Sequence, residues 1–352
     1  MKSLRLARLI VCVGALAAAL ASAPSVAQQV PLQKVRLAVG TTVLNVGYPM
    51  LTLAATLGYW KAEGYDVELI PVGASLQAIQ QMVAGNAEFA EVNASAIIQA
   101  NVQNDLPVRV LLSNGIIDWS IAVDVDGPIK SIKDLKGKVI ASNGPGSIST
   151  YEIDKILQQG GLGLKDVEIK VVPFTQMALA LNNKAVDAAL AIPPFSYQIR
   201  DGGFGIMFAN PDDYVRPAPT ALSVNSVNTE WAKQNPDLVR RYYIAYQHGV
   251  RDYCQAFHNG PNRKEMIDLL VRSGTEKRPE MLNDYGWPSR DPLGRINIDS
   301  ALDIAAWYVA NKFAGAVPPR ERIADLSYID YANAKLGPFV LENKDSTSKG
   351  CR

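Results

Sequence analysis

A chain of 352 residues is long enough to form two domains with separate cores, and its 48% hydrophobic and 20% charged residues are typical of a globular protein. This composition excludes a chain that is disordered throughout. The formal net charge is only +1 and the chain has no run of Lys and Arg, so we expect no nucleic-acid partner.

The first 27 residues have the pattern of a secretory signal peptide. Three basic residues within the first eight positions precede an apolar run over 9–20, and Ala27 ends a segment of small residues. The apolar run is too short to cross a bilayer comfortably, although an N-terminal membrane anchor is the alternative interpretation. Cleavage after Ala27 would change the formal net charge from +1 to −2, because the removed segment holds three basic residues and no acidic one. We therefore expect an exported, soluble mature chain.

Two stretches of the chain repeat the order strand, helix, strand, helix, strand. In the first copy these elements are predicted at 34–40, 48–63, 63–72, 76–85 and 86–93. In the second copy they are predicted at 138–143, 150–159, 163–173, 174–183 and 184–192. The residues at 66–69 match those at 166–169. Because strands that alternate with helices form parallel sheets, the repeat predicts two α/β lobes, each with a mainly parallel sheet flanked by helices.

The segments around the second copy read as connections between the lobes. Residues 109–127 predict two strands broken at Asn114, and 219–226 predict one more strand. Amphipathic helices follow, at 237–258 and at 300–313, with predicted N-caps at Thr229 for the helical region and at Asp299 or Ser300 for the last helix. We expect lobe 1 to comprise 31–120 and 226–340, lobe 2 to comprise 121–225, and 341–352 to be a disordered tail.

Six loops follow the strands of the two copies, and ligands of α/β sheets bind beyond the carboxyl ends of the strands. These loops lie at 40–47, 73–77, 93–97, 143–150, 173–177 and 192–196. None contains Lys, Arg, Asp or Glu, and several lead into a helix N-terminus, which accepts anionic oxygens. The alternative is that their Ser, Asn and Gly residues are plain N-caps and turns. The loops predict a small ligand with at most one charge.

Three residues near the crossings between lobes could add to such a site. Trp119 could supply an aromatic wall, Asp118 an acid and Arg216 a counter-charge, and each is equally compatible with a structural role.

At this point the sequence resembles a known family. Residues 57–96, 131–169 and 183–194 are similar to periplasmic substrate-binding proteins of ABC importers, in the branch that handles sulfonates, nitrate, taurine and thiamin-pyrimidine precursors. The resemblance implies a two-lobed clamshell of type II-like topology with two hinge crossings, a periplasmic monomer, and a small organic ligand passed to an ABC permease in the inner membrane. One departure is that no acidic residue precedes Pro193, which weakens any inference toward a cationic ligand.

The resemblance also implies ligand-binding positions, to which the 173–177 loop adds Phe174 and the first crossing between the lobes adds Trp119. The positions matched to the family are Thr41, Thr42, Asn45, Ser75, Asn93, Ser95, Asn143, Gly146, Ser147, Pro194 and Phe195.

Enzyme and metal functions find little support in the sequence. The 143–150 loop lacks the Lys of a phosphate-binding loop, and its match to the dinucleotide fingerprint fails at Ser149. The chain has no G-x-S-x-G or H-E-x-x-H motif. A related enzyme that makes the thiamin pyrimidine carries a cysteine cluster, which this chain lacks. Cys254 and His258 share a helix face, but no fourth ligand is near. We expect no catalytic residue, cofactor or metal.

The sequence therefore predicts the solute-binding component of an importer for a small organic monoanion, such as a sulfonate or an aromatic carboxylate. Two alternatives stay open: a ligand-sensing partner of a membrane receptor, and a binder of a neutral heterocycle such as a thiamin-pyrimidine precursor. A disulfide between Cys254 and Cys351 is also open, and the polar tail around Cys351 favours unpaired cysteines.

Overall fold

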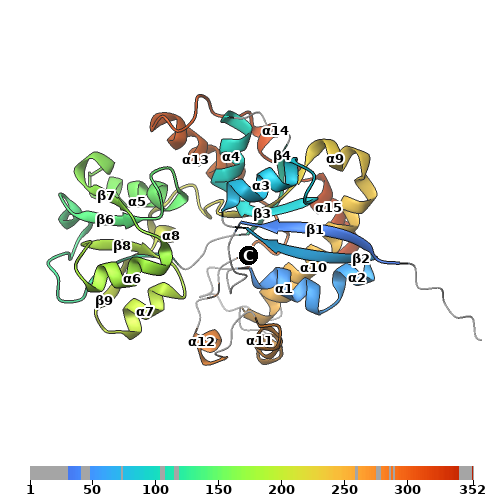
Figure 1. Ribbon diagram of the computed structural model, residues 1–352, viewed down its shortest axis with the longest axis horizontal. Coiled ribbons are helices and arrows are strands. Elements are labelled where there is room, and N and C mark those ends of the chain that lie inside the picture. Colours follow the sequence, from blue (N-terminus) through green and yellow to red (C-terminus); the bar gives the residue numbers. More distant parts are fainter. Residues whose placement is uncertain are drawn as a thin grey trace, which may run out of the picture. The chain divides into compact units, whose positions relative to one another are not determined.

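Two five-stranded sheets with equivalent strand orders organise the chain (Figure 1). The computed structural model describes residues 31–40, 48–72, 74–103, 108–114, 119–257, 261–274, 279–284, 287, 290–340 and 351, with the backbone alone at 102, 103, 108–114, 281 and 284. The predicted signal peptide, and the predicted disordered tail apart from Cys351, lie outside these residues.

The first sheet has the order β2-β1-β3-β10-β4 and the second the order β7-β6-β8-β5-β9. The first is built from β1 (Gln33–Val39), β2 (Tyr65–Pro71), β3 (Phe89–Asn93), β4 (Val108–Asn114) and β10 (Ser223–Asn228). The second is built from β5 (Ser120–Asp124), β6 (Val139–Ser142), β7 (Glu168–Val171), β8 (Ala188–Ala191) and β9 (Gly205–Ala209). β10 and β5 run antiparallel to both of their neighbours, and the other pairings are parallel. Within the described residues, the predicted repeat of mainly parallel α/β units is therefore confirmed.

Helices flank both sheets. Those that follow strands of the first sheet are α1 (Pro49–Thr56), α2 (Tyr59–Ala62), α3 (Ser75–Val83) and α4 (Ala94–Gln103). Those of the second sheet are α5 (Ile148–Gln159), α6 (Phe174–Asn182), α7 (Phe195–Asp201) and α8 (Pro211–Tyr214), with 3₁₀ turns at Ile132–Leu135 and Leu164–Asp166. The C-terminal series is α9 (Thr229–Gln234), α10 (Pro236–Phe257), α11 (Arg263–Arg272), α12 (Pro279–Asp284), α13 (Ile298–Ala310), α14 (Arg320–Ile323) and α15 (Ser327–Leu336). None of the helices described here has the length and apolar character needed to cross a bilayer.

The structure corrects the predicted start and continuity of three helices. The single helix predicted over 48–63 is two helices, because Gly58 adopts a left-handed conformation with φ of 76° between α1 and α2. The N-cap of α9 is Asn228, not Thr229, since its side chain accepts the backbone N–H groups of Glu230 and Trp231. The N-cap of α13 is Asn297, which accepts the N–H of Ser300 at 3.3 Å.

A buried polar and aromatic cluster fixes the strand that leads to two predicted ligand residues. The ring of Phe89 on β3 stacks on Tyr242 of α10 with centroids 3.6 Å apart. Two residues on, the fully buried carboxylate of Glu91 accepts hydrogen bonds from the Tyr246 hydroxyl at 2.9 Å and the Asn225 side chain at 3.1 Å. Burying a carboxylate is costly unless it is hydrogen-bonded, so these contacts hold β3 in place up to Asn93.

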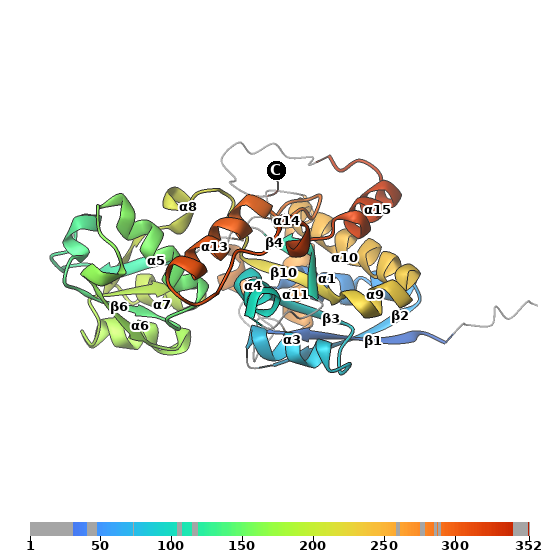
Figure 2. The same ribbon diagram turned by 90° about the horizontal axis from the view of Figure 1, so that it is seen from above.

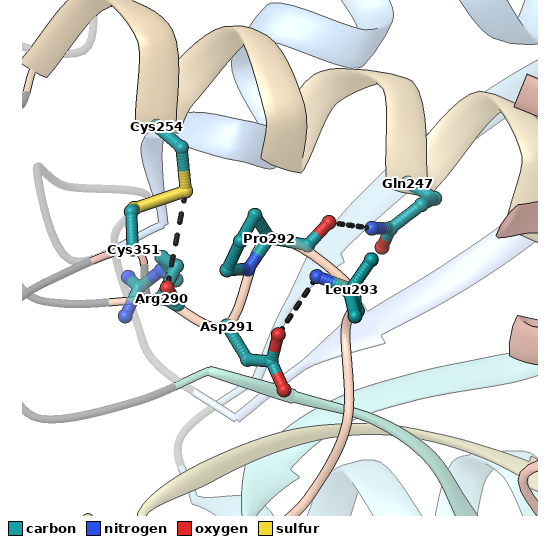
Figure 3. Close-up of a disulfide and its surroundings, with 7 residues drawn as sticks. All are labelled: Gln247, Cys254, Arg290, Asp291, Pro292, Leu293 and Cys351. Atoms are coloured by element: carbon teal, nitrogen blue, oxygen red, sulfur yellow. Dashed lines mark hydrogen bonds between the residues drawn. A yellow bond between two sulfur atoms is a disulfide. The ribbon is translucent and has the colours of Figure 1, made fainter. Parts of the chain in front are cut away.

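Cys254 and Cys351 form a disulfide, which shows that the expectation of unpaired cysteines is wrong (Figure 3). The two Cα atoms lie 5.6 Å apart although 97 residues separate them in sequence. Cys254 is fully buried on α10, and its sulfur lies 3.9 Å from the carbonyl oxygen of Arg290. About two turns earlier on the same helix, the Gln247 amide donates to the Pro292 carbonyl. The composition of the tail around Cys351 carried no sign of this long-range pairing.

Candidate functional site

The loop between β6 and α5 brings four hydroxyl side chains together: Ser142, Ser147, Ser149 and Thr150, called here the hydroxyl cluster. Ser142 Oγ lies 2.6 Å from Thr150 Oγ1 and 2.9 Å from Ser149 Oγ, and Ser147 Oγ lies 2.7 Å from Ser149 Oγ. A hydroxyl can both donate and accept, so the partly exposed Ser147 can redirect its hydrogen toward a ligand without moving its oxygen atom, whereas the other three hydroxyls are buried and shape the loop.

Two predicted site residues in this loop already have structural partners. Ser147 is the N-cap of α5: its hydroxyl accepts the Thr150 N–H at 3.3 Å and donates to the Gly144 carbonyl at 2.7 Å. The side-chain oxygen of Asn143 accepts a hydrogen bond from Ser149 at 2.5 Å, and Asn143 itself is exposed. The capping role considered as the alternative is therefore present, and the partly exposed Ser147 still leaves a polar edge for a ligand.

Gly146, in the same loop, is held by residues from the C-terminal part of the chain. Its carbonyl accepts a hydrogen bond from the Tyr308 hydroxyl of α13. A Cβ atom at position 146 would lie 3.3 Å from the ring of Phe313, closer than most carbon contacts. A larger residue at position 146 would therefore require the Phe313 ring to shift by a few tenths of an ångström.

The loops at the end of the first sheet are joined through Ser75. Its hydroxyl accepts the backbone N–H of Asn93 at 3.1 Å, which ties the start of α3 to the end of β3. A Cβ atom at Gly40 would lie 2.7 Å from the Ser75 Cα atom, so glycine is required there. Ser95 is buried in the first turn of α4. The other predicted site residues of this sheet, Thr41, Thr42 and Asn45, lie outside the described residues.

Two predicted aromatic residues are in contact near the strand ends of the second sheet. The rings of Trp119 and Phe174 have centroids 5.7 Å apart with an interplanar angle of 59°. Trp119 is 4% exposed, and its indole N–H is buried and has no hydrogen-bond partner among the described residues. A buried donor without a partner costs free energy, so this N–H is a candidate to meet a ligand acceptor.

Pro194 and Phe195 lie at the end of the neighbouring strand. Pro194 is the residue before α7 and Phe195 is its first residue, and both are partly buried. Because Ser120 of β5 pairs with Ala191 of β8, Trp119 lies at the same end of the sheet as this loop.

Arg216, which the sequence suggested as a counter-charge for the ligand, has a structural role instead. Its guanidinium donates to the carbonyl oxygens of Val215 at 2.6 Å and Asp212 at 3.0 Å, and so binds the end of the short helix α8. Asp118, the expected acid, lies outside the described residues. The described parts of the six loops thus offer hydroxyls, amides and aromatic rings and no charged side chain.

Tyr308 is the site residue that sequence reasoning missed. It is fully buried, burial raises the pKa of its hydroxyl, and polar contacts with the side chains of Ser95 and Gln99 oppose that rise. Tyr308 thus lies near predicted ligand-loop residues of both sheets: its hydroxyl donates to Gly146 after β6, and Ser95 after β3 is among the side chains that lower its pKa. Its partner Gly146 lies 162 residues away, and nothing in the sequence around Tyr308 marks it.

A surface cavity of about 470 Å³ lies elsewhere, at the base of the first sheet beside α9 and α14. Its lining contains none of the predicted ligand residues. The lining residues are Val227, Thr229, Glu230, Ala232, Lys233, Glu321, Ala324, Asp325, Leu326 and Tyr328.

The described residues contain no group of three or more His, Cys, Asp and Glu side chains able to hold a metal ion. Cys254 is bound in the disulfide and His258 lies outside the described residues, so the helix pair considered from the sequence gains no support.

Comparison with known proteins confirms the resemblance seen in the sequence. The riboflavin-binding protein RibY of Chloroflexus aurantiacus is 27% identical over 262 residues, which cover 73% of this chain and 71% of RibY. The putative periplasmic sulfonate-binding protein SsuA of Methylobacillus flagellatus has a TM-score of 0.70 at 23% identity, with 90% of this chain and 100% of SsuA covered. The periplasmic nitrate-binding protein NrtA of Synechocystis PCC 6803 has a TM-score of 0.68 at 16% identity, with 87% of this chain and 89% of NrtA covered.

These likenesses establish the periplasmic-binding-protein fold, with two mixed sheets flanked by helices. The family model described as NMT1/THI5 like matches residues 47–256, which is more than half of the chain. The protein is therefore a member of the NMT1/THI5-like family.

Proposed function

We propose that this protein is the periplasmic solute-binding component of an ABC importer and that it captures a small organic molecule between two lobes by hinge closure. Lobe 1 would comprise 31–120 and 226–340 apart from α13, and lobe 2 would comprise 121–225 together with α13, whose Asp303 and Trp307 are bonded to α5. The family membership and the sulfonate- and nitrate-binding proteins of the same fold support this function.

The observation that carries the proposal is the hydroxyl cluster at the N-terminus of α5. The first-turn N–H groups of a helix and its partial positive charge favour an anionic oxygen, and the partly exposed hydroxyl of Ser147, which lies within 3.3 Å of the three buried hydroxyls of the cluster, adds a donor. No charged side chain occurs in the loop, so a polyphosphate would lack the cations that it needs. A single sulfonate or carboxylate group on an organic body fits this chemistry best.

A neutral planar heterocycle is the second candidate ligand class. The contacting rings of Trp119 and Phe174 offer an aromatic wall, and the unpaired indole N–H of Trp119 could donate to a ring acceptor. RibY, which is named for riboflavin binding, supports the same class. The loss of Arg216 as a counter-charge also favours a ligand without strong charge.

Catalysis is not part of the proposal. The six strand-end loops hold no Cys, His, Lys or carboxylate to act as nucleophile, base or acid, and within the described residues no such group is hydrogen-bonded to the hydroxyls of the cluster. Binding and release are the chemistry that these side chains support.

A thermal-shift comparison of three probes tests the ligand class. Riboflavin represents the neutral heterocycle, 4-toluenesulfonate the aromatic monoanion and hexanesulfonate the aliphatic monoanion. A cognate class should raise the melting temperature in proportion to the logarithm of its concentration, since a ligand at 1,000 times its Kd stabilises by about 4 kcal/mol. Small-angle scattering with the same probe should show a smaller radius of gyration. Binding without compaction would refute hinge closure, and no shift with any probe would refute these ligand classes.

Export and partner need separate measurements. The periplasmic protein should begin at Gln28 by mass spectrometry and run as a monomer in light scattering.

Loss of ligand uptake on deletion of the gene would support import, whereas unchanged uptake together with a lost transcriptional response would support a ligand-sensing partner of a membrane receptor.

A further inference from the structure

Helix α13 lies beside α5 and α4 and is anchored at its start to the segment that returns from the second sheet to the first (Figure 2). The Asn297 side chain donates to the Pro219 carbonyl at 2.9 Å, and the Ser300 hydroxyl accepts the Ala221 N–H at 3.0 Å. Both contacts are to backbone groups just before β10, so the start of α13 is fixed relative to the backbone of that segment.

The middle of α13 is held against α5 by charged and aromatic side chains. Asp303 accepts the Tyr151 hydroxyl at 2.7 Å and pairs with the Lys155 ammonium at 2.6 Å. The Trp307 indole N–H donates to the Asp154 carboxylate at 2.8 Å. These partners are mostly buried, so α13 and the helix that follows the hydroxyl cluster are firmly joined.

The end of α13 contacts the ligand loops themselves. The Tyr308 hydroxyl donates to the Gly146 carbonyl, and α13 packs against α4, the helix that carries Ser95 and Gln99. The ring of Phe313 packs over Gly146 and against the rings of Trp307 and Tyr308. One phenol oxygen therefore lies where a loop of the first sheet meets a loop of the second.

We propose that Tyr308 is a positioning residue that sets the conformation of the 143–147 loop and couples it to the start of α4. Its hydroxyl fixes the direction of the Gly146 peptide, and through it the orientation of the Ser147 N-cap. Through the proximity of Tyr308 to Ser95, a shift of the 143–147 loop would change the position of the start of α4, and the reverse. The expected effect of Tyr308 on ligand affinity rests on the proposed function, whereas its expected effect on the conformation of the 143–147 loop does not.

Tyr308→Phe tests the proposal, with Tyr151→Phe as the matched control. Both variants remove one phenol hydroxyl from the contact between α13 and its neighbours, but Tyr151 donates to Asp303, which keeps its ion pair with Lys155. Loss of one hydrogen bond changes an equilibrium by about fivefold, the factor that corresponds to about 1 kcal/mol.

Hydrogen–deuterium exchange of the ligand-free protein is the primary measurement. The N–H groups of Ser147, Thr150 and Tyr151 bond within the loop and report its opening. We expect them to exchange about fivefold faster in Tyr308→Phe than in the wild type, and at unchanged rate in Tyr151→Phe. Unchanged exchange in Tyr308→Phe, or equal acceleration in both variants, would overturn the proposal.

Ser95→Ala provides a second variant should Tyr308→Phe unfold. It removes only the contact on α4, and we expect faster exchange at Ser147 although that residue lies 52 positions away. No change at Ser147 would overturn the coupling.

Binding of riboflavin and 4-toluenesulfonate then separates this inference from the proposed function. A probe that binds the wild type should dissociate about fivefold faster from Tyr308→Phe. If neither probe binds, the proposed ligand classes fail while the exchange result still decides the role of Tyr308.

Discussion

The Ser142 hydroxyl, at the end of β6, lies 2.6 Å from the Thr150 hydroxyl, in the first turn of α5. The same Ser142 oxygen is within 3.3 Å of Ser147 Oγ, Ser149 Oγ and the Gly144 carbonyl. A strand end and a helix start are thus joined by side chains, and the loop between them is shaped before any ligand arrives.

Replacement of Ser142 by alanine should lower the free energy of unfolding by about 1–3 kcal/mol, because fully buried hydroxyls lose a partner. Urea denaturation measures this effect. Thr175→Ala, which removes an exposed hydroxyl on α6, is the control and should change stability by less than about 0.5 kcal/mol. Equal stability of Ser142→Ala and the wild type would show that the cluster does not hold the loop.

Gly40→Ala should be destabilising by about 1–3 kcal/mol, since the new methyl group would lie 2.7 Å from the Ser75 backbone. Movement of Ser75 would also lengthen its hydrogen bond to the Asn93 N–H. The melting temperature reports the loss. Gly144→Ala is the control, because a Cβ atom there would meet only Ser147 at 3.9 Å. A Gly40→Ala protein as stable as Gly144→Ala would contradict the close approach.

The Cys254–Cys351 disulfide should contribute about 2–5 kcal/mol to stability, because it closes a loop with a sequence separation of 97 residues in the unfolded chain. Cys254→Ala and Cys351→Ala should unfold at the same lower urea concentration. Dithiothreitol should bring the wild type to that midpoint and leave both variants unchanged. Two free thiols in the native protein, detected by mass spectrometry after alkylation, would disprove the bond.

Burial raises the pKa of Glu152 on α5 well above its usual range, and the nearby charge of Asp212 adds to the rise. A folded-state pKa above the unfolded value of about 4.3 means that the native state holds the proton longer. This contribution to stability is therefore present at low pH and is lost as the pH rises from the unfolded pKa to the raised folded pKa.

Glu152→Gln should remove that loss and become more stable than the wild type as the pH rises from 4 to 8. Urea midpoints at each pH measure the difference, with Glu168→Gln, an exposed residue of β7, as the control. A stability difference between Glu152→Gln and the wild type that stays constant with pH would show that Glu152 does not titrate in this way.

The sequence predicted the strands that repeat, because each has a local pattern: the apolar runs of β1 and β6 are each followed by a helical pattern. The positions of Ser75, Asn143 and Ser147 at strand ends followed from the same pattern. Helix caps were less predictable, since Asn228, Thr229, Asp299 and Ser300 are all good N-cap residues and only backbone geometry selects among them.

Contacts between distant segments could not be predicted. Tyr308 and Gly146, and likewise Cys254 and Cys351, meet although their sequence separations are 162 and 97, and no local pattern encodes such a meeting. Arg216 was considered as a counter-charge from its place in the chain, but its guanidinium is used by nearby carbonyls.

The most direct test of the account is isothermal titration of riboflavin, 4-toluenesulfonate and hexanesulfonate into the wild type and Ser147→Asp. Aspartate is also a good N-cap, so α5 should remain stable while a negative charge enters the hydroxyl cluster. Ser147→Asn is the neutral control of similar size. The account predicts that at least one probe binds the wild type at one site per chain and binds Ser147→Asp about 100-fold more weakly, with Ser147→Asn between them. A probe that binds all three proteins with the same affinity would place the ligand elsewhere and contradict the account.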